Sequence, residues 1–283
     1  MKVIRKIDEM RRSVSDIKSR GMSVGFVPTM GYLHEGHLSL VRESLREANA
    51  TVVSIFVNPA QFGPREDFKE YPRDLNRDSE ILEREGIDYL FVPEAGEIYP
   101  QGYKTYVEVC DLQDRLCGRS RPGHFRGVCT VVLKLFNIVN PDISFFGQKD
   151  AQQAIILKRM VKDLNLDVKI EVLPIIREED GLALSSRNKY LTREERKAAH
   201  VLSKSLKQAQ SMMEKGERDS AAIIKEMKEI IGREPLVKID YVEIVDLDNL
   251  DHVPRIEKGA LAAVAVFIGK VRLIDNTILR TKE

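Results

Sequence analysis

The sequence predicts a doubly wound α/β domain with a mostly parallel sheet, followed by a smaller domain of helices and antiparallel strands. Short apolar, β-branched segments alternate with helical patterns through residues 1–176. One of these segments, TVVSIFV at 51–57, is apolar throughout, which is typical of a strand covered on both faces. In the last third of the chain, two long charged helical patterns precede two apolar segments. We therefore expect a Rossmann-like domain over residues 1–176 and a C-terminal α+β lid domain over residues 177–283.

The N-terminal domain opens with a charged amphipathic helix, after which strands and helices alternate. A strand, a helix and a strand within about thirty residues form a βαβ unit, whose crossover is right-handed. Pro28 is expected to end the first strand. The expected strands are 23–27, 51–57, 87–92, 105–109, 143–146 and 168–176. The expected helices are 7–19, 37–48, 72–85, 128–139 and 151–164.

The C-terminal domain is expected to begin its helices at Thr192. A threonine is a favourable N-cap, and Glu195 three positions later completes a capping box. The pattern predicts one helix to about Lys215 and a second helix from residue 220 to residue 231. Two strand-like segments follow and are expected to pair antiparallel, namely 239–245 and 260–271.

The composition argues against several classes of partner. Lys and Arg number 45 and Asp and Glu 44, so the net charge is +1, whereas nucleic-acid-binding proteins usually carry a basic excess. Cys110, Cys117 and Cys129 show neither an even count nor a CxxC spacing, so we expect no disulfide framework and no zinc site. The N-terminus lacks the apolar segment of a signal peptide, and no apolar run is long enough to cross a bilayer. A cytoplasmic protein without nucleic-acid or membrane partners is expected.

The stretch from Met30 to His37, MGYLHEGH, follows a predicted strand and opens a helix. Gly31 and Gly36 permit close approach of the backbone to a ligand, and the helix N-terminus supplies a positive dipole. His34 and His37 can face the same way and donate hydrogen bonds to phosphate oxygens. A tight βα turn with two surface histidines is the alternative. The strand, the glycines and the helix together favour a phosphate site.

A second cluster comes directly after the strand at 51–57. Asn58 and Gln61 are amides that can bind a hydroxyl or a carboxylate without adding charge. Asn-Pro is also a common turn signal, so this cluster alone is weak. Tyr71 is compatible with lining the same pocket and equally with ordinary surface packing.

The third cluster, GQKD at 147–150, follows another predicted strand. Ligands bind at the carboxyl ends of the strands in open α/β sheets. Lys149 could neutralise a phosphate, and Asp150 could accept hydrogen bonds from ribose hydroxyls or merely cap its helix. Gln153 lies about one turn into that helix, where it could still point into the cleft.

The fourth cluster is LSSRN at 184–188, at the proposed domain junction. Its two hydroxyls and the Arg187 guanidinium form a mobile phosphate clamp or an ordinary polar linker. A basic loop contains Arg115, Arg119, Arg121, His124 and Arg126. It could bind a phosphate, or it could equally form a solvent-exposed or inter-subunit surface. The sequence contains no HExxH zinc motif and no GxxxxGK[ST] P-loop motif. It also contains no GxSxG motif, so a serine nucleophile is not supported.

Five ordered motifs resemble the pantothenate synthetase (pantoate–β-alanine ligase) family across essentially the whole chain. They are PTMGYLHEGHLSLV, FVNPAQF, RPGHFRGV, FFGQKDAQQ and LALSSRN. The HxGH element alone is shared with other nucleotidylyltransferases and with class I aminoacyl-tRNA synthetases. Leu184 and Gln148 are mild departures from residues common in the family. The resemblance implies a Rossmann-like fold and an ATP-dependent ligase that joins pantoate to β-alanine through a pantoyl-adenylate, releasing AMP and pyrophosphate.

The resemblance also implies roles for individual residues. The implied catalytic residues are His37 as proton donor, His34, Lys149 and Arg187. Gln61 would contact both pantoate and β-alanine, and Gln153 would contact pantoate. The implied ATP-binding residues are Met30, Gly31, Tyr32, Leu33, His34, Glu35, Gly36, His37, Gly147, Gln148, Lys149, Asp150, Ile176, Leu184, Ser185, Ser186 and Arg187. Mg²⁺ is implied as the ATP counterion, held mainly by phosphates, and a homodimer is typical of the family.

Two other functions compete with this interpretation. A different nucleotidylyltransferase would transfer a nucleotide to a phosphorylated acceptor and leave a stable nucleotide ester. An ATP-binding regulatory module would bind ATP without turnover. The ligase hypothesis makes a geometric prediction of its own, namely that His37, Lys149 and Arg187 converge on one triphosphate.

Overall fold

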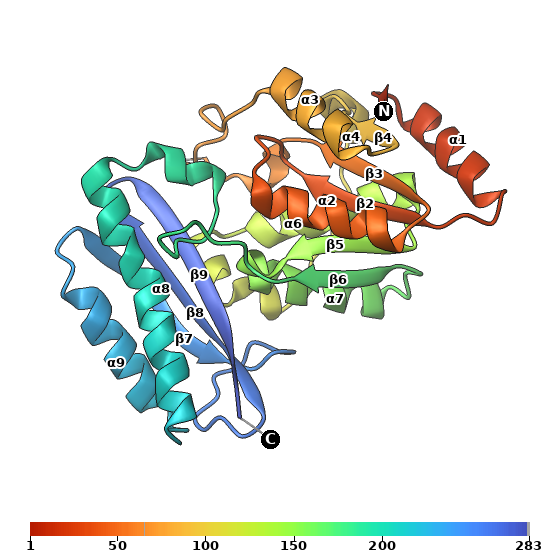
Figure 1. Cartoon of the computed structure of the whole chain (residues 1–283). Helices are drawn as coiled ribbons and strands as arrows, with labels where there is room; N and C mark the ends of the chain where they lie inside the picture. The colour runs from red at the N-terminus through yellow and green to blue at the C-terminus, as the bar shows by residue number, and fades with distance from the viewer. Residues whose placement is uncertain (65, 282–283) are drawn as a thin grey trace.

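Two separate sheets organise the chain, and the computed structural model describes residues 1–64 and 66–281 (Figure 1). The first sheet has six parallel strands in the order β1-β4-β3-β2-β5-β6. The second sheet has three antiparallel strands in the order β7-β8-β9. The predicted fold class is confirmed. The domain division between residues 176 and 177 stays a prediction.

The parallel sheet and its helices occupy the first part of the chain. Its strands are β1 Lys2–Ile4, β2 Val24–Thr29, β3 Ala50–Ile55, β4 Tyr89–Phe91, β5 Ile143–Gly147 and β6 Lys169–Leu173. The helices are α1 Ile7–Lys18, α2 Glu35–Glu47, α3 Leu75–Glu85, α4 Ala95–Ile98, α5 Cys117–Ser120, α6 His124–Val139 and α7 Ala151–Asp163. Short 3₁₀ turns are η1 Pro59–Gln61, η2 Leu112–Asp114 and η3 Gln148–Asp150.

The rest of the chain forms the antiparallel sheet and two long helices. These elements are η4 Ser186–Tyr190, α8 Arg193–Glu214, α9 Ser220–Gly232, β7 Val237–Val245, β8 Gly259–Ile268 and β9 Val271–Arg280. The predicted capping box is present, because the Thr192 hydroxyl accepts the Glu195 N–H and the Glu195 carboxylate accepts the Thr192 N–H.

Three predictions about strands were wrong. Residues 105–109 form no strand, and the Val107 N–H donates instead to the Thr130 hydroxyl at 3.0 Å. The segment 260–271 is not one strand, because a turn with Gly269 at φ 56° separates β8 from β9. Pro28 lies inside β2 rather than after it. At this position β2 pairs with β3 but no longer with β5. Proline is tolerated there because its missing N–H removes no hydrogen bond to β5.

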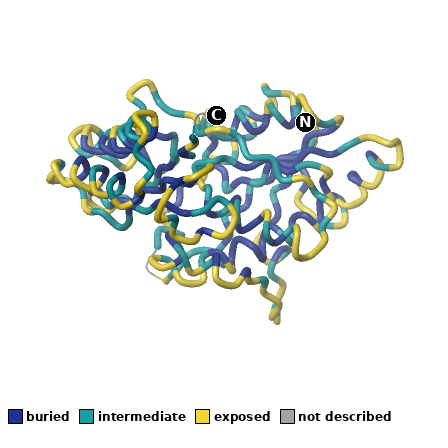
Figure 2. Tube along the Cα trace, turned by 90° about the horizontal axis from the view of Figure 1, so that it is seen from below, coloured by how far each residue is buried: buried dark blue, intermediate teal, exposed yellow. Residues whose placement is uncertain are grey.

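The antiparallel sheet is covered on both faces. One face packs against α8 and α9, and residues from its other face join the core of the parallel-sheet part. This double burial explains why the β8 sequence, GALAAVAVFI, is apolar nearly throughout. Figure 2 shows the buried stretches of the trace in the interior and the exposed stretches along the outer loops. None of the helices in the described ranges is long and apolar enough to span a bilayer.

Candidate active site

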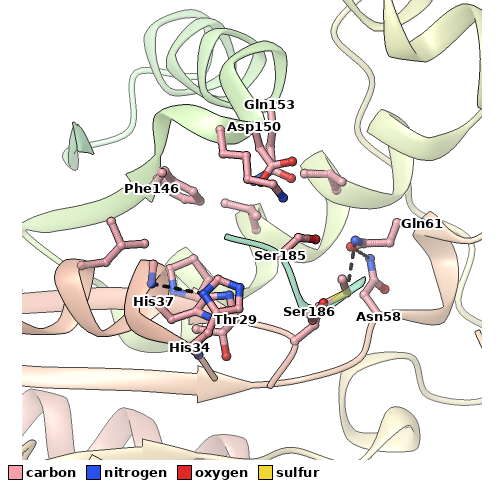
Figure 3. Close-up of a pocket in the computed structure, with 18 of the residues that line it drawn as sticks. Thr29, His34, His37, Asn58, Gln61, Phe146, Asp150, Gln153, Ser185 and Ser186 are labelled. Atoms are coloured by element: carbon pink, nitrogen blue, oxygen red, sulfur yellow. Dashed lines mark hydrogen bonds between the residues drawn. The ribbon is translucent and has the colours of Figure 1, made fainter. Parts of the chain in front are cut away.

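A cavity of about 240 Å³ opens where β2 and β5 part at their carboxyl ends (Figure 3). Figure 3 shows the two histidines on one side of it, and Asp150 and Gln153 across from them. It is the place at which an open α/β sheet binds ligands, since the strand order reverses there. The predicted site residues that line it are Met30, His34, Gly36, His37, Gln61, Gly147, Lys149, Asp150, Gln153, Ile176, Leu184, Ser185, Ser186 and Arg187.

Other predicted ATP-binding residues lie outside the cavity wall, namely Gly31, Tyr32, Leu33, Glu35 and Gln148. Leu33 is in the core of the parallel-sheet part with 1% of its surface exposed. Glu35 forms an ion pair with Arg42 at the surface. Gln148 turns toward the antiparallel sheet. Their contacts with ATP stay predictions.

A buried carboxylate that the sequence reasoning missed holds the histidine loop. Asp78 of α3 is 1% exposed, and its two oxygens accept the N–H groups of Tyr32 at 2.6 Å and Leu33 at 2.9 Å. Tyr32 has φ 52° and Gly31 φ 83°, so the loop follows a left-handed path that needs such support. Burial raises the pKa of the Asp78 carboxyl, while the two backbone N–H groups act in the opposite direction.

The two histidines present N–H groups to the cavity without carrying charge. The Nδ1 atom of His34 accepts the Gly36 N–H at 3.2 Å, and that of His37 faces the His34 N–H at 3.4 Å. The ring hydrogen of each neutral imidazole is therefore on Nε2. Burial lowers the pKa of His34 to about 4, and burial likewise holds the pKa of His37 well below its ordinary value. Both rings are neutral hydrogen-bond donors at pH 7.

The amide of Gln61 is oriented by Asn58. The Asn58 Nδ2 donates to the Gln61 Oε1 at 3.0 Å and to the Gly127 carbonyl at 3.1 Å, and its Oδ1 accepts the Tyr99 hydroxyl at 2.8 Å. Asn58 is 1% exposed, and these contacts occupy its polar atoms. The Gln61 Nε2 is left to face the Met30 sulfur at 3.3 Å and the cavity. Gln61 thus presents a donor.

Three cations from the described ranges line the cavity, and two of them are held by carboxylates of one segment. Arg121 pairs with Glu66 at 2.6 Å, and Arg187 pairs with Asp67 at 2.8 Å. Lys149 forms no ion pair within residues 1–64 and 66–281. Its charge is thus the one most directly available to an incoming anion.

The basic loop divides between the cavity and the surface. Arg121 and His124 line the cavity, while Arg115, Arg119 and Arg126 form ion pairs elsewhere. The His124 Nδ1 donates to the Gln61 carbonyl at 2.8 Å, because its Nε2 lies 3.1 Å from the Arg121 guanidinium and can only accept there. Burial lowers the pKa of His124 to about 4. Tyr71 also lines the cavity, with its hydroxyl 3.5 Å from that of Ser186.

An apolar wall completes the cavity, and no role was predicted for its residues from the sequence. It consists of Phe56, Val131, Val132, Leu135 and Phe146, from β3, α6 and β5 and the residues beside them. In the described part of the chain, no group of three or more His, Cys, Asp and Glu side chains is placed to hold a metal ion. The cavity therefore offers hydrogen-bond donors, cations and an apolar surface.

Comparisons with known proteins show which family the chain resembles. The family model for pantoate–β-alanine ligase matches residues 2–278. A pantothenate synthetase of Caldicellulosiruptor bescii is 56% identical over 282 residues, covering 100% of both chains. The one of Thermosipho africanus is 57% identical over 279 residues, covering 99% of this chain and 100% of its own.

Solved structures give the same result. Pantothenate synthetase of Thermus thermophilus superposes with a TM-score of 0.93 and 44% identity, over 98% of this chain and 99% of that one. Pantoate–β-alanine ligase of Francisella tularensis, solved in complex with β-γ ATP and β-alanine, has a TM-score of 0.79 and 35% identity, over 98% of this chain and 97% of that one. The chain belongs to the pantoate–β-alanine ligase family.

Proposed function

We propose that this chain condenses pantoate with β-alanine in an ATP-dependent reaction that passes through a pantoyl-adenylate. The observation that carries the proposal is one cavity that joins two neutral histidines, Lys149 and two glutamine amides in a member of this family. The Francisella tularensis relative was solved with β-γ ATP and β-alanine, which supports the same pair of ligands here.

The reaction has two steps. First, a pantoate carboxylate oxygen attacks the α-phosphorus of ATP, and the bond to the β-phosphate oxygen breaks to release pyrophosphate. Second, the amine of β-alanine attacks the acyl carbon, loses a proton and expels AMP. A carboxylate is a poor acyl donor, and adenylation gives it a good leaving group. The protein has to orient two anions that repel each other, which is a task for positioned charges and donors.

The phosphates are proposed to lie between the histidines and Lys149. The His34 and His37 Nε2–H groups donate to phosphate oxygens, and Lys149 and Arg187 offset the charge that builds up on pyrophosphate. Figure 3 shows the labelled histidines on one side of the cavity and Asp150, the neighbour of Lys149 in the sequence, on the other. The proton-donor role assigned to His37 is one of hydrogen bonding, because its ring is neutral.

The remaining contacts follow the same division of the cavity. Gln61 and Gln153 are proposed to hold the hydroxyl and carboxylate groups of pantoate, and Gln61 also the β-alanine. The apolar wall of Phe56, Val131, Val132, Leu135 and Phe146 suits the two methyl groups of pantoate. The nucleotide is proposed to lie along Gly147–Asp150, Ile176 and Leu184–Arg187.

Mg²⁺ is proposed to arrive with ATP, held mainly by its phosphates. The donor set of the cavity fits this arrangement, since Asp150 is the carboxylate in its lining and no metal-binding group of three such side chains exists in the described residues. The ion would supply charge compensation on the triphosphate. The reaction is proposed to take place in the cytoplasm, because ATP is its substrate.

The pyrophosphate-exchange reaction tests the proposed function. We expect pantoate-dependent exchange of labelled pyrophosphate into ATP, because the first step is reversible and needs no β-alanine. Addition of β-alanine is expected to give AMP and an amide. A folded protein that shows no exchange would contradict the proposal. A stable nucleotide ester of a phosphorylated acceptor would instead favour the alternative nucleotidylyltransferase.

Lys149→Ala is expected to lower the rate of exchange by about 10²-fold or more, because the cavity loses a cation that pairs with no carboxylate of residues 1–64 and 66–281. His37→Ala is expected to have a similar effect. Lys158→Ala is the matched control, since this exposed lysine lies on α7, the helix that directly follows η3, and outside the cavity. A near-normal rate in Lys149→Ala would remove Lys149 from the catalytic residues.

The neutral state of His34 can be followed by its ring proton resonances in the ligand-free protein. Its pKa of about 4 means no titration between pH 8 and pH 6. In the unfolded chain this histidine has an ordinary pKa near 6.5, so on acidification it is protonated there before it is protonated in the folded protein. The free energy of unfolding therefore decreases as the pH falls from about 6.5 toward 4. His34→Gln assigns the resonance. A titration midpoint near 6.5 for the His34 resonance would contradict the prediction, because burial would then not lower the pKa of this imidazole.

We also propose a homodimer. Residues 105–109, TYVEV, favour a strand but have no strand partner within residues 1–64 and 66–281, and Tyr106 is 49% exposed. A second copy could supply the missing partner by strand pairing. Light scattering is expected to give twice the 32.3 kDa chain mass, and Tyr106→Lys is expected to weaken the association. A monomer at micromolar concentration would contradict the proposal.

A further inference from the structure

Two neighbouring polar residues of β9 have side chains that reach from the antiparallel sheet to segments proposed to hold the nucleotide. Asp275 and Asn276 are buried, with 3% and 4% exposed. Adjacent side chains of a strand point to opposite faces, so the two residues reach different targets. The β9 strand packs against the 3₁₀ turns η3 and η4, and Figure 1 shows it beside the parallel-sheet part.

Asn276 holds the turn that carries Lys149. Its Nδ2 donates to the Gln148 carbonyl at 2.9 Å and to the Lys149 carbonyl at 3.0 Å, and its Oδ1 accepts the Gln148 Nε2 at 3.2 Å. Both hydrogens of one amide are therefore used on consecutive carbonyls of η3. These bonds form between residues about 130 apart in sequence and fix the backbone directly at the cation.

Asp275 holds the other wall of the nucleotide region. Its carboxylate forms a bidentate pair with Arg177 at 2.6 and 2.9 Å, and Arg177 also donates to the Gly181 carbonyl at 3.0 Å. Arg177 stands in a hairpin closed by the Leu184 N–H and the Ile176 carbonyl at 3.0 Å. One strand thus anchors both GQKD and the start of the SSRN segment.

We propose that Asn276 is a positioning residue for the adenylation step and acts through Lys149. Neither Asn276 nor Asp275 lines the 240 Å³ cavity, so neither touches substrate in the proposed arrangement. Both line an adjoining space of about 90 Å³ that Lys149 and Arg187 also border. The catalytic consequence rests on the proposed function, while the anchoring of η3 does not.

The size of the effect follows from the geometry of phosphate stabilisation. A charged group displaced by about 1 Å can lose on the order of 10²-fold in rate. Asn276→Ala removes both donors from the η3 carbonyls and leaves space for the turn to shift. We expect the pyrophosphate-exchange rate to fall by about 10- to 100-fold. Asn137→Ala is the matched control, because this exposed asparagine makes one Nδ2 bond to the Leu133 carbonyl and does not line the cavity. An unchanged rate in Asn276→Ala would overturn the proposal.

Asn276→Asp separates hydrogen bonding from packing. Aspartate has the same shape as asparagine but, when ionised, cannot donate to the two carbonyls. The exchange rate of Asn276→Asp is therefore expected to be no higher than that of Asn276→Ala. If aspartate restored the rate that alanine loses, shape alone would explain the site, and the positioning role would be rejected.

A double-mutant cycle tests whether Asn276 acts through Lys149. If it does, Asn276→Ala should cost less than about threefold in a Lys149→Ala background, because the group that it positions is already gone. The same large factor in both backgrounds would overturn the proposal. Thermal unfolding of all variants identifies a temperature at which each is folded.

Amide hydrogen exchange gives a readout that does not depend on the reaction. The backbone N–H groups of residues 148–150 are expected to exchange faster in Asn276→Ala than in the natural sequence or in Asn137→Ala. Unaltered protection there would overturn the anchoring of η3. The two proposals can fail separately. If the natural protein showed no pyrophosphate exchange, the proposed function would be rejected, while faster amide exchange in Asn276→Ala would still support the anchoring of η3.

Discussion

The separation of β2 from β5 is the constraint on which the rest of the site depends. Pairing between these central strands is confined to Gly25–Ile143 and Phe26–Ser144, whereas β2 stays paired with β3 as far as Thr29. Beyond Phe26 the two strands therefore leave a gap at their carboxyl ends. One wall of the gap carries the histidine loop and the other carries GQKD. The donors and the cation face each other because one sheet opens between them.

Buried polar side chains then fix the walls of that gap. Asp78 holds the histidine loop, Asn58 orients Gln61, and Asn276 holds the turn of Lys149. Each is buried and uses its polar atoms on backbone groups or on another side chain, which limits the positions that the neighbouring segment can take. The residues proposed to contact substrate are therefore held by residues whose own polar atoms already form hydrogen bonds within the protein. Preorganisation of this kind is what electrostatic stabilisation of a charged transition state requires.

The sequence was sufficient for the fold class and for the strand ends that carry chemistry. Apolar runs such as 51–57 report burial directly, and polar residues that follow them must lie at one edge of a parallel sheet. The strand at 105–109 could not be judged, because β propensity does not reveal whether a partner strand exists. The β8–β9 turn at Gly269 is too short to interrupt an apolar pattern. Asp78 and Asn276 could not be found, since each acts on a segment 45 or more residues away and its residue type alone gives no sign of that contact.

The carboxylates of Glu66 and Asp67 give the cavity its own internal counterions. Both lie on one short segment, and they pair with Arg121 and Arg187. An anionic ligand that takes over these guanidinium groups exchanges one carboxylate for another acceptor, so the charge around each arginine stays balanced throughout. The ionic strength of the solution then influences such a ligand less than three cations would suggest, because the displaced partner is part of the chain. An anion that binds either guanidinium group therefore competes with an acid of this one segment.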